Sequence, residues 1–179
     1  GKIIAIAMWR PEEKQGGVLV ENEKGEADRE KWDEYGEDSW IFRGSEKQIL
    51  KEFWRYVSGE AGRLITFNGR SFDGPFLMLR SAILGLEPTR NFMTYRYSFK
   101  KHCDLAEVVS FHRARQLESL DFWCRRTGLK SPKENMDGEN VQKAYKEGNW
   151  EKIARYCLGD AKATASLYRV LEPIIKIME

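Results

Sequence analysis

The segment from Leu64 to Leu84 limits the possible folds more than any other part of the chain. Residues 64–67 are apolar or β-branched and predict a buried strand. Asn68-Gly69 then predicts a tight turn, because both residues tolerate the backbone angles that turns need. After Pro75 the apolar residues recur with the spacing of one helix face. A strand, a turn and a helix in this order indicate an α/β fold, in which ligands bind at the carboxyl ends of strands.

The turn in this segment carries four side chains that are candidates for contact with a ligand. Asp73 lies where the helix begins, and an aspartate there is either a binding residue or an N-cap. Arg70 either reaches a phosphate or remains solvated. The candidate residues of the turn are Asn68, Arg70, Phe72 and Asp73.

A second candidate site lies on a helix predicted near the other end of the chain. Tyr156 and Asp160 are four residues apart, so they lie on the same helical face. Apolar residues on that face, including Ile153 and Leu167, turn it toward the protein interior. A carboxylate that is turned inward needs a partner, and a metal ion is one candidate. The alternative is a Tyr–Asp pair at the helix surface.

Local patterns predict several further features of the fold. Residues 2–8 and 17–21 predict the two strands of a hairpin. Three helix starts have capping residues, namely the capping-box pair Ser45 and Gln48, Asp104, and Asn149. Pro173 is expected to stop or kink the last helix.

Together the two segments resemble the second and third motifs of DEDDy-type 3′–5′ exonucleases. The second motif is Asn68-x-x-x-Phe72-Asp73 and the third is Tyr156-x-x-x-Asp160. More narrowly, the chain is similar to predicted exonucleases related to the proofreading domain of family B DNA polymerases, from about Lys2 to Tyr168. Further stretches that carry this resemblance are Lys2–Trp9, His102-x-Asp104-Leu105 and Lys130-Ser-Pro-Lys133.

The resemblance implies one ribonuclease H-like α/β domain over residues 1–179, with a mixed five-stranded sheet flanked by helices. It implies metal-dependent hydrolysis of phosphodiester bonds from the 3′ end of single-stranded DNA, although the residues do not separate DNA from RNA. Two Mg²⁺ or Mn²⁺ ions, which prefer oxygen ligands, would act in this reaction. The implied roles are metal binding by Asp73 and Asp160, orientation of the attacking water by Tyr156, approach to the scissile phosphate by Lys133, and nucleic-acid binding by Asn68, Phe72 and Arg70.

One part of the family pattern is missing from these residues, namely the first motif, an Asp-x-Glu on the central strand of the sheet. Three explanations are open. In the first, the motif and its strand precede Gly1, and Lys2–Met8 is the second strand. In the second, Lys2–Met8 is the first strand, and Ala5 and Ala7 replace the two carboxylates. In the third, the chain has lost catalysis and kept a surface that binds nucleic acid or docks a partner without cutting.

Composition excludes several other classes of protein. No apolar run approaches the roughly 18 residues of a membrane-spanning helix, so we expect no membrane association. Three cysteines without a C-x-x-C pair argue against a disulfide framework or a zinc site and favour a reducing cytoplasm. Two histidines make a histidine metal site or a serine-type triad hard to assemble.

Charge is unevenly distributed along the chain, whose net charge is +2. Acidic residues dominate 21–38, which we expect to be a solvated loop or a short helix. The remainder is therefore basic and suits a nucleic-acid surface. The run from Tyr95 to Lys101 interleaves aromatic and basic residues, as single-strand binders often do. An ordinary loop, or a strand with half its aromatics in the core, gives the same pattern.

Overall fold

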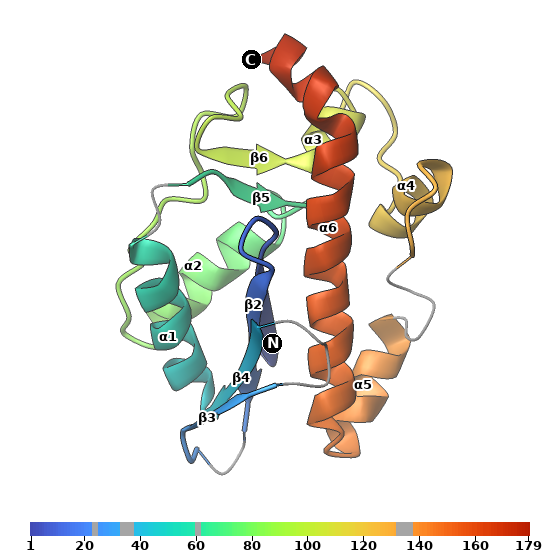
Figure 1. Cartoon of the computed structure of the whole chain (residues 1–179). Helices are drawn as coiled ribbons and strands as arrows, with labels where there is room; N and C mark the ends of the chain where they lie inside the picture. The colour runs from blue at the N-terminus through green and yellow to red at the C-terminus, as the bar shows by residue number, and fades with distance from the viewer. Residues whose placement is uncertain (23–24, 33–37, 60–61, 132–137) are drawn as a thin grey trace.

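The computed structural model describes residues 1–22, 25–32, 38–59, 62–131 and 138–179 (Figure 1). Its strands are β1 (Ala5–Arg10), β2 (Gln15–Glu21), β3 (Asp28–Lys31), β4 (Asp38–Gly44), β5 (Leu64–Thr66) and β6 (His102–Asp104). Its helices are α1 (Glu46–Ser58), α2 (Asp73–Ile83), α3 (Leu105–Val109), α4 (Leu120–Arg126), α5 (Gly138–Lys146) and α6 (Trp150–Met178). The strands form two separate sheets.

The larger sheet has four strands in the order β1-β2-β4-β3. The predicted hairpin is confirmed, since β1 pairs antiparallel with β2 and Ala5 lies opposite Val20. The prediction of a loop or short helix for the acidic segment is wrong at Asp28–Lys31, which pairs antiparallel with β4. All four residues of β3 are charged and exposed, as is common for an edge strand that must not pair with another molecule.

The smaller sheet consists of β5 and β6, which pair in parallel. The strands of the described residues are therefore divided between two sheets, and the single five-stranded sheet implied by the resemblance is not formed by these residues alone. In Figure 1, β5 and β6 run roughly horizontally, whereas β2 and β4 run roughly vertically.

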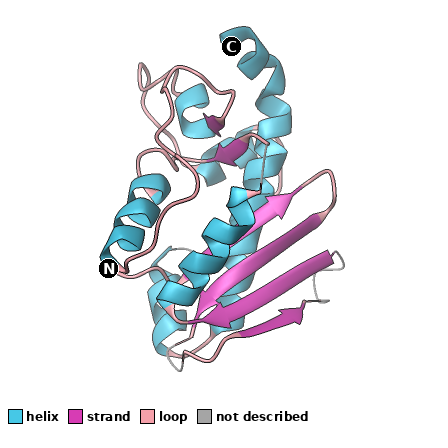
Figure 2. Cartoon of the chain, turned by 90° about the vertical axis from the view of Figure 1, so that its left-hand side faces the viewer, coloured by secondary structure: helices cyan, strands magenta, loops and turns pink. Residues whose placement is uncertain are grey.

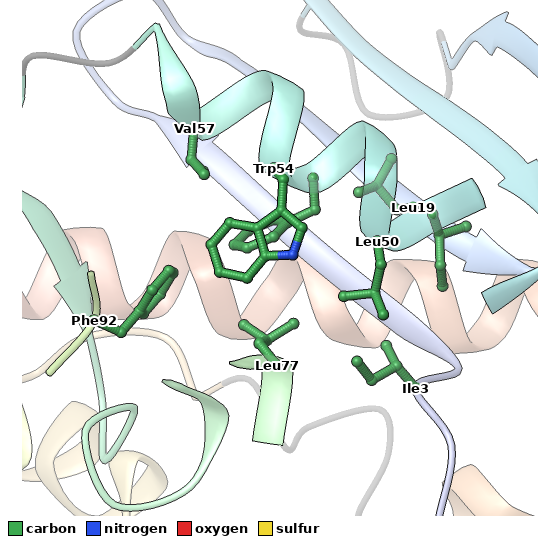
Figure 3. Close-up of a cluster of buried hydrophobic side chains, with 9 residues drawn as sticks. Ile3, Leu19, Leu50, Trp54, Val57, Leu77 and Phe92 are labelled. Atoms are coloured by element: carbon green, nitrogen blue, oxygen red, sulfur yellow. The ribbon is translucent and has the colours of Figure 1, made fainter. Parts of the chain in front are cut away.

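Helices cover both faces of the larger sheet because β2 alternates its apolar side chains. Leu19 points toward α1, whose start is fixed by the predicted capping box between Ser45 and Gln48. Val18 and Val20 point the other way and pack with residues of α6. Figure 3 shows the core on the α1 side, where side chains from α1, β2, α2 and the loops meet: Ile3, Leu19, Leu50, Trp54, Val57, Leu77 and Phe92.

Helix α6 connects the two sheets. Its first half packs Ala154 and Leu158 on the larger sheet, and its second half packs Leu167 beside β6 and α3. Asn149 caps the start of α6, as predicted. Pro173 does not stop the helix, which ends at Met178. No helix among the described residues is long and apolar enough to cross a membrane.

Within the described part of the chain, β1 and β5 each pair with another strand on one side only, and we call the unpaired side of each strand its open edge. All six residues of β1 and all three of β5 are only half-buried. By contrast, β6 is fully buried, although it too pairs on one side only within the described residues. β1 is the strand of the larger sheet that lies toward the smaller one (Figure 2). The side chains of β1 and β5 are therefore less buried than those of the central strands of a sheet normally are.

Candidate active site

Asp104, at the end of β6, holds the turn that follows β5. Its Oδ1 accepts the backbone N–H of Asn68 (2.7 Å), and its Oδ2 accepts that of Arg70 (2.9 Å). Oδ1 also accepts the N–H of Ala106 (3.0 Å), so the predicted N-cap role of Asp104 is confirmed. With these bonds Asn68 adopts a left-handed conformation, with φ of 63°. The side chains of the turn are thus placed by a buried carboxylate of the neighbouring strand.

Asn68 and Phe72 are presented at the surface of this turn. The Asn68 side-chain oxygen accepts a hydrogen bond from Arg113 Nη2 (2.6 Å), and the same nitrogen donates to Ser71 Oγ (3.0 Å). Phe72 is 63% exposed, and its ring stacks on Phe76 with a centroid distance of 5.9 Å. An amide and an exposed ring on one turn suit a ligand with a polar edge and a flat face, as a nucleotide has.

Asp73 is the first residue of α2, but it does not act as the helix cap, because Phe72 occupies the N-cap position without a side-chain bond. Desolvation of the carboxyl raises the pKa of Asp73, and the charge of Asp104 raises it further. Solvent still reaches much of the residue, which limits this rise. Among the described residues no cationic side chain pairs with Asp73. The Asp73 carboxylate is therefore available as a ligand for a cation.

Tyr156 and Asp160 lie on α6 beside β1. Tyr156 packs in the same cluster as Ile153 and Ala5, and the thiol of Cys157 is hydrogen-bonded to the backbone of Ala7. Asp160 follows between the part of α6 that packs on the larger sheet and the part that packs beside the smaller one.

The Cys157 thiol lies within reach of the charges of both predicted metal ligands. Burial raises its pKa to about 12, and the charges of Asp160 and Asp73 both add to the rise. Two carboxylates that act on one sulfur lie in the same region of the fold, although they come from α2 and α6.

The ligand set for a metal is incomplete in the described part of the chain. Asp73 and Asp160 have the hard oxygen donors that Mg²⁺ and Mn²⁺ prefer, and the raised pKa of Asp73 fits a site that lacks a countercharge. However, no three Asp, Glu, His or Cys side chains of the described residues meet in a way that could hold an ion. Lys133, the fourth predicted catalytic residue, falls within 132–137 and lies outside the described residues.

Arg70 is turned into the protein, contrary to its predicted role in nucleic-acid binding. It is buried, and its guanidinium donates to the carbonyl oxygens of Thr94 (2.6 Å) and His102 (3.3 Å). Its Nε also lies 3.1 Å from Glu107 Oε2, an ion pair between two buried side chains. The correction has a physical reason, since the buried Glu107 carboxylate needs a cation close to it.

Sequence reasoning missed two residues of the site. Arg113 gave no local signal, because its contact with Asn68 joins positions far apart in the chain. Glu107 was hidden in an apolar helix, where only the unusual presence of a carboxylate among inward residues could have drawn notice.

Alkaline pH is expected to destabilise the protein through Cys157. The thiol pKa rises from an ordinary value of 9.0 to about 12 on folding, so the stabilisation is complete below pH 9.0 and is lost as the pH rises through about 12. Urea unfolding at a series of pH values above 8 should show a steeper fall for the natural chain than for Cys157→Ala. Equal slopes would contradict the burial of this thiol.

Comparison with known proteins identifies the family of this chain. A family model described as a predicted 3′–5′ exonuclease related to the exonuclease domain of PolB matches residues 2–174. The DNA polymerase of Desulfurococcus sp. (strain Tok) is 30% identical in a comparison over 149 residues that covers 73% of this chain and 19% of the polymerase. The DNA polymerase of Thermococcus sp. (strain 9oN-7) gives the same identity, 30%, with 73% and 19% covered. The chain thus spans about a fifth of the length of these relatives. It belongs to the family of predicted 3′–5′ exonucleases related to the exonuclease domain of PolB.

Proposed function

We propose that this chain forms the main part of a metal-dependent 3′–5′ exonuclease domain that removes nucleotides from single-stranded DNA. The observation that supports the proposal is that the charges of Asp73 and Asp160 both act on the Cys157 thiol, which lies on α6 beside β1. Two carboxylates from separate motifs, together with the half-buried amide of Asn68 and the exposed ring of Phe72, supply part of what hydrolysis at a terminal nucleotide requires. The buried or half-buried free thiols suit a reducing compartment, and we place the protein in the cytoplasm.

Each candidate residue has a role in this proposal. Asp73 and Asp160 hold Mg²⁺ or Mn²⁺, and such ions neutralise charge at the reacting phosphate and make a nucleophile from water. Tyr156 orients the attacking water through its hydroxyl group. Asn68 and Phe72 hold the terminal nucleotide by hydrogen bonding and stacking. Lys133 approaches the scissile phosphate.

The open edges suggest where the missing carboxylates belong. A strand placed between β1 and β5 would have β1 and β2 on one side and β5 and β6 on the other, which makes a five-stranded sheet with a new central strand. Its side chains facing α6 would lie near Asp160. The half-burial of β1 and β5 supports this placement, because both strands would be covered by it. We propose that an Asp-x-Glu strand encoded before Gly1 occupies this position.

The alternative, in which Ala5 and Ala7 replace the carboxylates, has less support. Both alanines do face the α6 side, where they pack near Cys157. However, a central strand pairs on both sides, whereas among the described residues β1 pairs with β2 alone. If the alternative holds, the chain binds nucleic acid without cutting it.

Cleavage of 5′-labelled single-stranded DNA tests the proposal. Residues 1–179 and a form extended by the residues encoded before Gly1 are each incubated with Mg²⁺ or Mn²⁺. We expect a ladder that shortens from the 3′ end with the extended form only. Asp160→Asn in that form should slow cleavage at least ~100-fold, since even groups that merely orient metal ligands are worth 10–100-fold.

The matched control is Asp28→Asn, which changes an exposed carboxylate of β3 and should cut at the unchanged rate. Cleavage that survives Asp160→Asn would contradict the assignment of the metal ligands. If neither form cuts, and binding weakens as salt rises, the chain is a nucleic-acid-binding module and the exonuclease proposal fails.

A further inference from the structure

An aromatic and basic surface leads away from the candidate active site. We call it the aromatic strip, and its residues are Phe72, Arg113, Tyr97, Arg96 and Tyr95. Its starting point is set by Arg113, whose bonds to Asn68 (2.6 Å) and Ser71 (3.0 Å) place it on the turn that carries Phe72. The strip therefore begins where the terminal nucleotide is proposed to bind.

Tyr95 and Tyr97 are exposed rings with a firm support. They are 74% and 60% exposed, and their centroids lie 5.8 Å apart in an edge-to-face arrangement. The ring of Tyr97 lies 4.8 Å from that of His112, which in turn stacks on buried Phe99 at 5.3 Å. Exposed aromatic rings that packing holds in place are suited to stacking with unpaired bases.

The surface around these rings is basic. Residues 88–116 contain two acidic side chains, Asp104 and Glu107, and both are buried. One of the cations is anchored, since Arg96 Nε lies 2.8 Å from Glu107 Oε1 while its side chain remains 46% exposed. The basic residues of the stretch are Arg90, Arg96, Lys100, Lys101, Arg113 and Arg115. An anionic chain is the partner that this charge pattern fits.

The turn that carries His112 and Arg113 is strained. Phe111, His112 and Arg113 have φ values of 49°, 54° and 72°, a conformation that side chains other than glycine rarely adopt. Ser110 Oγ helps to hold the turn by accepting the Arg113 N–H (3.1 Å). The strained turn places His112 under Tyr97 and Arg113 against Asn68, so it aligns the strip with the site.

We propose that the aromatic strip binds the nucleotides that precede the 3′-terminal one in a single-stranded nucleic acid. Bases stack on Tyr97 and Tyr95, and phosphates lie against Arg113 and Arg96. A duplex is a poor partner, because its bases are already stacked and paired. The 3′-to-5′ direction along the strip rests on the proposed function, whereas the binding itself needs no cleavage.

Fluorescence anisotropy in EDTA measures this binding without hydrolysis. The probes are labelled oligo-dT and oligo-rU of roughly 12 nucleotides, within the range of single-strand sites, and a DNA duplex of equal length. We expect residues 1–179 to prefer single strands. Tyr97→Ala and Tyr95→Ala should each weaken binding by about fivefold or more. Arg113→Gln should lower the slope of log affinity against log salt by about 0.7.

Matched variants separate this role from general effects. Tyr97→Phe keeps the ring and should bind normally, as should Phe122→Ala, which removes an exposed ring from α4. Arg55→Gln, on the exposed side of α1, should leave the salt slope unchanged. The proposal that the strip binds single strands would be overturned by unchanged affinity in both tyrosine-to-alanine variants, or by equal affinity for the duplex and the single strands. If tyrosine-dependent binding persists while no form cuts DNA, the strip stands and only the exonuclease proposal fails. The two homopolymers show whether DNA or RNA is preferred.

Discussion

Asp104→Ala is expected to lower the free energy of unfolding by roughly 3–5 kcal/mol, because an unsatisfied buried donor costs ~1–3 kcal/mol. The Asp104 carboxylate is completely buried and accepts the backbone N–H groups of Asn68, Arg70 and Ala106. An alanine leaves all three donors without an acceptor. Urea unfolding followed by circular dichroism measures the change, with the slope against urea checked for two-state behaviour.

Asp104→Asn refines this expectation. An asparagine keeps one acceptor oxygen in place of two, so it can serve the Asn68 and Ala106 donors but not the Arg70 donor, and the loss should be smaller. Asp28→Ala provides the exposed control and should change stability by less than about 0.5 kcal/mol. A loss for Asp104→Ala as small as that of Asp28→Ala would show that the turn does not depend on this carboxylate.

Arg70→Met is expected to cost ~3–5 kcal/mol of stability, the usual effect of removing one partner of a buried ion pair. The substitution leaves Glu107 buried with a weaker set of partners and leaves the carbonyl oxygens of Thr94 and His102 without their donor. Thermal and urea unfolding should both show the loss. This result would support a structural role for Arg70 in place of the nucleic-acid contact expected from its position in the motif.

A double substitution distinguishes an ion-pair effect from a loss of packing. Arg70→Met combined with Glu107→Leu removes both charges, and it should be less destabilising than the sum of the two single changes. Arg96, which also pairs with Glu107, then loses its partner but can turn to solvent, since it is 46% exposed. If Arg70→Met left stability intact and abolished binding of single-stranded DNA, the assignment of Arg70 to the interior would be wrong.

Local signals in the sequence were enough for much of the fold. The hairpin of β1 and β2, the capping box at Ser45 and the caps at Asp104 and Asn149 depend on residues close in the chain, and all were predicted. The acidic strand β3 was not predicted, because its backbone bonds are supplied by pairing with β4 and its side chains have no strand pattern.

The candidate site likewise has some features that local sequence predicts and others that depend on contacts between distant residues. Spacing alone placed Tyr156 and Asp160 on one helical face, but only the family resemblance joined them to Asp73. Arg70 was assigned to the wrong side of the turn because its partner, Glu107, lies on α3 and is not visible from the local sequence. Contacts between distant elements decided each of these cases.

The position of α6 has a consequence for synthesis in the cell. One face of the larger sheet, with Val18, Val20 and Ile41, is covered by Ala154 and Leu158 of this late helix. At ribosomal rates of roughly 5–20 residues per second, on the order of ten seconds pass between translation of β4 and translation of α6. During that interval the sheet is left with an uncovered apolar face. Nascent chains should therefore engage hydrophobic-surface chaperones until α6 emerges from the ribosome.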